Sequence, residues 1–242
     1  MAENILSYSF KAYRENIKLI SFFSIPSLIA FLIPTMVNTP VFSALGGSFL
    51  RTGSIPDMSG SDLGVVICGV LVSLYLMSFA IVNINLVIKS QRTSTSIKKE
   101  VMKGITGYTL NVFSLFLLGT IALLIIQLVT FEMGAQMWLA PLLSLIVWIP
   151  LFYAPAGLVI DELRPFRAAQ KSVSMVIGKL PYFLLWLVIA FALLALFDGL
   201  ALALLPHKIG SLAVLLLNSL LLMPFLIVLQ TQIHMSKYTI LD

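Results

Sequence analysis

The chain has 242 residues, of which 60% are hydrophobic and only 10% are charged. This composition excludes a soluble domain, because a chain of this length cannot bury so many long apolar stretches away from water. The net charge of +5 does not indicate a nucleic-acid partner, since the basic residues cluster beside the apolar stretches. The sequence therefore predicts an all-α, polytopic membrane protein.

Six apolar runs are long enough to cross the roughly 30 Å hydrocarbon core of a bilayer as α-helices. They cover residues 18–36, 63–88, 109–131, 137–160, 181–205 and 210–232. The polar segments that connect these runs are too short to form a separate domain. We therefore expect one six-span transmembrane domain that includes the whole chain, residues 1–242.

Basic residues are distributed unequally between the two sides of the predicted spans. All but two of the 15 lysines and arginines lie before the first span, between the second and third, between the fourth and fifth, or after the sixth. Only Arg51 and Lys208 lie in the other connections. Because Lys and Arg are retained on the cytoplasmic side, we expect a multi-pass protein with both termini in the cytoplasm.

A short stretch with helical amphipathic spacing precedes each odd-numbered span. The apolar positions are Leu6, Phe10, Tyr13 and Ile17 before the first span, Ile97, Val101 and Ile105 before the third, and Phe166, Ala169, Val173 and Val176 before the fifth. Pro165 and Gly178 are predicted to begin and end the last of these helices. Basic residues occupy the opposite faces, so we expect three helices that lie in the cytoplasmic interface and lead into the next span.

The basic faces of these helices are candidate contacts for anionic lipid headgroups. The candidate residues are Lys11, Arg14, Lys98, Lys99, Arg167 and Lys171. Three copies of one unit, each an interfacial helix followed by a hairpin of spans, would produce this pattern. Unrelated helical hairpins with basic anchors would produce it too, so both interpretations stay open.

Four amides and one carboxylate within the predicted spans are candidate intramembrane polar positions: Asn83, Asn85, Gln127, Asn218 and Asp198. We expect the amides to form hydrogen bonds between helices, typically worth about 0.6 kcal/mol, and a polar substrate path is the alternative. A carboxylate at membrane depth is costly unless it is paired or faces water, which makes Asp198 a functional candidate. A helix that starts at Pro181 reaches Asp198 after about 26 Å, however, so we expect the span to end near Phe197 with Asp198 at the outer interface.

Pro141, Pro150 and Pro155 make the fourth apolar run the least regular one. Each proline removes a backbone donor and clashes with the preceding turn, so we expect kinks in this span. Broken helices line substrate sites in transporters, and the nearest counterpart here is the pair Pro26 and Pro34 in the first run.

Residues that would support catalysis or metal binding are not grouped in the sequence. Cys68 is the only cysteine, and we expect it to be a small buried residue of the second span. Neither His207 nor His234 has another histidine or a cysteine at ligand spacing. The pair Asp161–Glu162 is expected to bond to Arg164 or Arg167 and to cap the following helix, with a metal site as the alternative. The sequence thus predicts no catalytic residue, no cofactor and no metal.

Residues 153–162 (YAPAGLVIDE) and 164–172 (RPFRAAQKS) carry a resemblance to a known group. They resemble a pattern in six-span prokaryotic membrane proteins that include the membrane domain fused to some glycerophosphodiester phosphodiesterases and the uncharacterised YciC-like proteins. Residues 10–18 (FKAYRENIK) are similar to that group's opening, where a helix ends in Asn before the first span. The resemblance implies a six-helix bundle with cytoplasmic amphipathic connectors in a prokaryotic cell membrane. It implies no activity, because catalysis in the fused members belongs to a separate soluble domain.

Three functions are compatible with these features. The favoured one is a noncatalytic membrane protein that binds lipid, with anionic headgroups as partners, or assists a partner protein. A small-solute transporter or channel is the alternative, and an intramembrane lipid enzyme is the third. The lack of convergent charged residues within the spans favours the first, and a protein partner or a second copy of the chain stays open.

Overall fold

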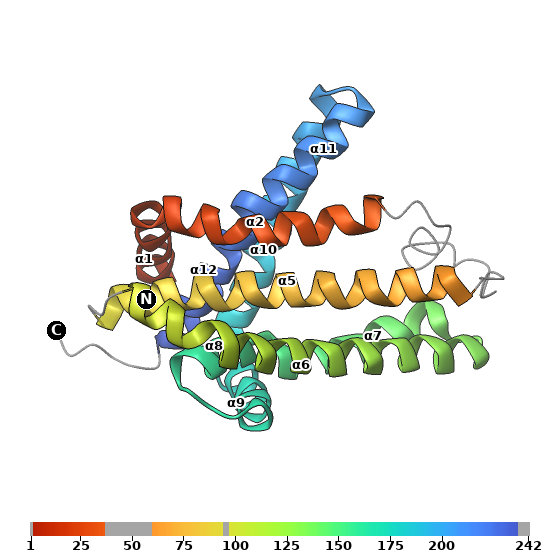
Figure 1. Cartoon of the computed structure of the whole chain (residues 1–242), viewed down its shortest axis with the longest axis horizontal. Helices are drawn as coiled ribbons and strands as arrows, with labels where there is room; N and C mark the ends of the chain where they lie inside the picture. Colours follow the sequence, from red (N-terminus) through yellow and green to blue (C-terminus); the bar gives the residue numbers. More distant parts are fainter. Residues whose placement is uncertain (1, 37–59, 94–96, 237–242) are drawn as a thin grey trace.

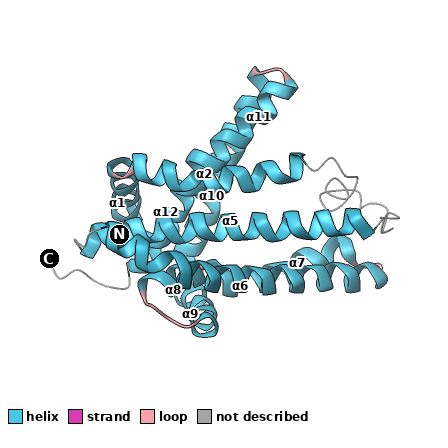
Figure 2. Cartoon of the chain, viewed as in Figure 1, coloured by secondary structure: helices cyan, strands magenta, loops and turns pink. Residues whose placement is uncertain are grey.

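The structure is a computed structural model, and it describes residues 2–36, 60–93 and 97–236. These residues form helices, with no strand among them. The helices are α1 (Ala2–Glu15), α2 (Ile17–Met36), α5 (Gly60–Thr93), α6 (Ile97–Glu132), α7 (Gln136–Phe152), α8 (Ala154–Ile160), α9 (Pro165–Gly178), α10 (Leu180–Leu204), α11 (His207–Leu217), the π-helical turn η2 (Asn218–Leu222) and α12 (Met223–Met235). Figure 2 shows that the loops from Glu132 onward, between consecutive described helices, are short.

The predicted all-α, polytopic class is confirmed. Within the described ranges, five stretches are long and apolar enough to cross a membrane: Gly64–Gln91, Gly107–Glu132, Gln136–Ile160, Leu180–Leu204 and Ile209–Met235. A sixth is added if the bent pair of α1 and α2 is counted as one span. The six predicted runs correspond in chain order to α2, α5, α6, α7 with α8, α10, and α11 with η2 and α12.

The helices have two main directions. Helices α2, α5, α6 and α7 run side by side, with α5 packed between α2 and α6. The hairpin of α10 and α11 leaves this group at a steep angle and projects away from it (Figure 1).

The core lies where α1, α5, α8, α9 and α12 meet. Residues 82–88 of α5 and 153–159 around α8 are buried without interruption, because other helices surround these segments on every side. We call this end of the bundle, formed by α1, α8, α9 and the last turns of α12, the basic end. Elsewhere the apolar side chains face outward, and only 11% of the spanning part of α10 is buried. Lipid is as apolar as a protein core, so such faces do not need to be covered by protein.

Two of the three predicted connecting helices are separate elements. Helix α1 meets α2 at 85°, and the Asn16 side chain at the bend donates to the Ala12 carbonyl at 3.0 Å. Helix α9 begins at Pro165 and ends at Gly178, as predicted. The prediction for residues 97–105 is wrong, because these residues form the first turns of α6. No proline separates them from the following span, so one helix continues to Glu132.

Candidate functional site

The fourth span is broken at Tyr153, between α7 and α8. The hydroxyl of Ser172 in α9 accepts a hydrogen bond from the Tyr153 N–H at 2.9 Å and donates one to the Ile149 carbonyl at 2.7 Å. Those two backbone groups would bond to each other in an unbroken helix, so the serine is inserted into the ladder. The Gln230 side chain of α12 donates to the Phe152 carbonyl at the same break. The kink predicted from the prolines is thus held by side chains of α9 and α12.

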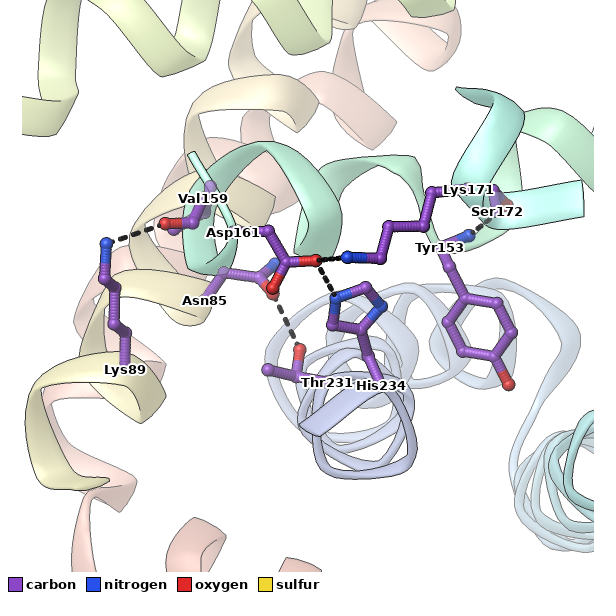
Figure 3. A network of polar contacts seen from close by, with 9 residues as sticks. All are labelled: Asn85, Lys89, Tyr153, Val159, Asp161, Lys171, Ser172, Thr231 and His234. Atoms are coloured by element: carbon purple, nitrogen blue, oxygen red, sulfur yellow. Dashed lines mark hydrogen bonds and ion pairs between the residues drawn. The ribbon is translucent and has the colours of Figure 1, made fainter. Parts of the chain in front are cut away.

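Asp161 lies directly after α8 and is the centre of a polar cluster (Figure 3). Its side chain is only 4% exposed. One carboxylate oxygen, Oδ2, lies 2.9 Å from Lys171 Nζ and 3.1 Å from His234 Nε2. A carboxylate only accepts hydrogen bonds, so His234 donates from Nε2 in this contact. Asp161 therefore joins the end of α8 to α9 and α12.

Glu162, the next residue, points to a different helix. Lys89 of α5 lies 2.9 Å from Glu162 Oε1 and donates to the Val159 carbonyl at 2.9 Å. The backbone of Glu162 has φ of 54°, a left-handed conformation that costs a residue with a side chain about 1 kcal/mol or more. This turn ends α8. It directs Asp161 to Lys171 and His234, and Glu162 to Lys89.

The buried amides of α5 differ in what they contact. Asn85 Oδ1 accepts a hydrogen bond from the Thr231 hydroxyl of α12 at 2.8 Å, as the prediction of interhelical bonding required. Asn83 Nδ2 instead donates to the Phe79 carbonyl of its own helix at 2.7 Å.

Lys179, between α9 and α10, donates to Ser236 Oγ at 2.8 Å, and burial lowers the pKa of this lysine. The basic end is thus cross-linked by polar contacts between α5, α9 and α12.

The other predicted intramembrane polar residues lie far from this cluster in the chain. Gln127 Oε1 accepts a hydrogen bond from Gln136 across the turn between α6 and α7 at 3.3 Å. Asn218 Nδ2 in η2 donates to Asp198 Oδ2 in α10 at 3.2 Å. Helix α10 continues to Leu204, past both Phe197 and Asp198, and the expected position of Asp198 at the outer interface stays a prediction. The apolar residues that follow Asp198 sustain the helix past the polar position.

The six basic residues predicted to contact lipid differ in their exposure and in their contacts. Lys11 and Arg14 are exposed on α1, and Arg167 is exposed on α9. Lys171 is 38% exposed, but its ammonium group bonds to Asp161. Lys98 and Lys99 belong to the first turns of α6, and their side chains lie outside the described part of the structure. Cys68, expected to be buried, is exposed on α5.

Sequence reasoning missed the cluster around Asp161. It paired the two acids with Arg164 or Arg167, whereas they bond to Lys171, His234 and Lys89. His234 has no histidine or cysteine at ligand spacing in the sequence, and the described residues contain no group of three His, Cys, Asp or Glu that could hold a metal. The one usable signal was the acidic pair itself, placed after an apolar run and followed by a lysine on the next helix.

No protein-family model, no curated protein and no solved structure matches this chain. The resemblance to the six-span prokaryotic group therefore stays a prediction. The contacts of the cluster connect helices, and each described side chain in it has a protein partner. This arrangement is suited to fixing α9 and α12 in place at the basic end.

Proposed function

We propose that this protein is a noncatalytic multi-pass membrane protein that binds anionic lipid at the cytoplasmic face of a prokaryotic cell membrane. The observation that carries the proposal is the position of α1, which is set at 85° to α2. We take the shared direction of α2, α5, α6 and α7 as the membrane normal, and a helix at right angles to α2 then lies in the membrane plane.

The exposed face of α1 has the composition of a membrane-interface helix. Tyr8 and Phe10 are 64% and 59% exposed, and Lys11 and Arg14 lie on the same side, so the expectation that Phe10 faces away from the basic residues is wrong. Ser9, Ala12 and Tyr13 form the buried side, against the bundle. Aromatic rings insert at the headgroup level, while the basic groups attract anionic phosphates.

Helix α9 provides a second surface of the same kind. Phe166 and Ile177 are more than 70% exposed, and Arg167 is exposed next to Phe166, although the two were expected on opposite faces. Ser172 and Lys171 attach the other side of α9 to the bundle through the Tyr153 backbone and Asp161. A surface helix held at several points keeps its aromatic and basic residues in one orientation, which favours specific contact with headgroups.

The separation of the polar residues supports lipid binding over solute transport. The amides considered for a substrate path hydrogen-bond to different partners: Asn85 to Thr231, Gln127 to Gln136, and Asn218 to Asp198. A continuous path would require polar side chains that face one shared cavity.

The orientation is testable by cysteine labelling. We expect a cysteine at Ser96, on a Cys68→Ser background, to be protected from a membrane-impermeant thiol reagent in intact cells, and one at Ser48 to react. The physical reason is the excess of Lys and Arg in the connections on the Ser96 side. Both positions lie outside the described residues, and permeabilised cells provide the control. Ready labelling at Ser96 with protection at Ser48 would reverse the proposed orientation.

Lipid selectivity tests the function itself. We expect the triple variant Lys11→Gln, Arg14→Gln and Arg167→Gln to lose preference for phosphatidylglycerol over phosphatidylcholine. Each basic residue near the surface contributes about 1 kcal/mol, or roughly a fivefold change in affinity. Native mass spectrometry of the purified protein, released from nanodiscs that contain both lipids, measures the preference. Lys171 is kept, because its removal would leave Asp161 without its cationic partner.

The matched control exchanges the same positions conservatively, as Lys11→Arg, Arg14→Lys and Arg167→Lys. It retains the charges, so its lipid preference should equal that of the wild type, and high salt should weaken both. An unchanged preference in the Gln variant would contradict lipid recognition by α1 and α9.

A further inference from the structure

A groove lies beside the projecting α10–α11 hairpin, and no part of the function proposed above uses it. It has a volume of about 300 Å³ and is lined by residues of α2, α10, α11, η2 and α12: Phe31, Leu194, Ser211, Val214, Leu215, Asn218 and Met223. The wall is mostly apolar, and Asn218 connects it to the carboxylate of Asp198.

Asp198 and Asn218 each retain a buried acceptor oxygen without a hydrogen-bond partner among the described residues. Their single mutual bond uses Asp198 Oδ2, while Asp198 Oδ1 and Asn218 Oδ1 are buried without a partner among the described residues. Both of these oxygens are acceptors. None of the ion pairs among the described residues includes Asp198. An occupant that satisfies this pair must therefore supply hydrogen-bond donors, and a positive charge suits the carboxylate best.

The depth of Asp198 decides which occupant can reach it. Helix α10 continues to Leu204, about 9 Å beyond Asp198 at roughly 1.5 Å per residue, before the chain turns at Pro206. The residues between are apolar, so the carboxylate lies within the apolar part of the hairpin and not at its polar turn. The donors of a lipid are in its headgroup, at the membrane surface, whereas a transmembrane helix carries side chains at any depth. A neighbouring helix packs about 8–10 Å away, within reach of a long basic side chain.

We propose that this groove docks a transmembrane helix of a partner protein, and that a Lys or Arg within that helix pairs with Asp198. The π-helical turn at Asn218–Leu222 supports the local geometry, since it interrupts the regular helix where the polar pair lies. Tyr13 and Ser27 donate to the carbonyls of Leu221 and Ser219 in this turn, which ties the turn to α1 and α2. Apolar contacts with the groove add van der Waals packing to the ion pair.

The test uses synthetic transmembrane helices as probes. Three Leu/Ala helices, identical except for a single Lys, Leu or Glu at the depth of Asp198, carry an acceptor dye. The full-length protein, labelled with a donor dye at its only cysteine, Cys68, is reconstituted in nanodiscs of phosphatidylcholine, where the lipid selectivity of α1 and α9 plays no part. Energy transfer then measures the affinity within the bilayer.

We expect the Lys helix to bind about tenfold more tightly than the Leu helix, and the Glu helix more weakly than either. Asp198→Asn should abolish the difference between Lys and Leu helices. Leu194→Trp keeps the pair of Asp198 and Asn218 but fills the groove, so it should weaken the binding of all three probe helices. This second variant keeps the test decisive if Asp198→Asn lowers stability, which thermal unfolding reports.

Three results would overturn the proposal. The first is equal binding of the Lys and Leu helices to the wild-type protein. The second is dimerisation that depends on Asp198 in the absence of any probe, which would make a second copy of the chain the occupant. The third is a lipid that stays bound to the wild type and is lost from Asp198→Asn, which would assign the groove to lipid. None of these results bears on the contacts of α1 and α9 with anionic headgroups.

Discussion

Asp161→Asn is expected to lower the free energy of unfolding by about 2 kcal/mol. The carboxylate is 4% exposed and accepts charge-assisted bonds from Lys171 at 2.9 Å and from His234 at 3.1 Å. An amide of the same shape removes the negative charge, so the ammonium of Lys171 loses its buried counter-ion. Thermal and denaturant unfolding of the purified protein in bicelles measures the loss.

Glu162→Gln is the matched control for this prediction. Glu162 is adjacent in sequence and lies at the same distance, 2.9 Å, from a lysine, but its side chain is 57% exposed. Water solvates the carboxylate of Glu162, and the largely buried Lys89 keeps its bond to the Val159 carbonyl, so the loss of this ion pair should cost under about 1 kcal/mol. Equal effects of the two substitutions would show that burial does not set the strength of these contacts, and would contradict the structural role of Asp161.

Ser172→Ala is the second substitution with a large expected effect, again about 2 kcal/mol of unfolding free energy. The hydroxyl satisfies both the Tyr153 N–H and the Ile149 carbonyl at the break in the fourth span. Without it, two buried backbone groups lose their partner in an environment that supplies no water. Amide hydrogen exchange should also accelerate at Tyr153, because the bond that protects this N–H is gone.

Ser174→Ala serves as the control for Ser172. Ser174 belongs to the same helix, α9, but is exposed, so its replacement should leave stability within about 0.5 kcal/mol of the wild type. If Ser172→Ala behaved like Ser174→Ala, the break at Tyr153 would have to be held by other contacts, such as that from Gln230.

Much of the helical layout follows from the sequence alone. Apolar runs of about 20 residues predict spanning helices, because lipid requires every backbone group to bond within its own helix. Local signals place both ends of α9, which begins at Pro165 and ends at Gly178. The helix end at Asn16, where the structure has the bend between α1 and α2, was expected from the resemblance. These features depend on short-range sterics and backbone bonding, so neighbouring residues are sufficient to determine them.

The partners of the polar side chains, in contrast, were decided by the tertiary structure. His234 meets Asp161 across 73 residues of chain, and Thr231 meets Asn85 across 146. Arg164 and Arg167 are nearer to Asp161 in sequence, but α9 turns Arg167 outward and presents Lys171 to the carboxylate. The left-handed turn at Glu162 then directs that acid to Lys89 of α5. Sequence determined the helices because their bonds are local, whereas the cluster formed from side chains that only the packing of α5, α8, α9 and α12 brings together.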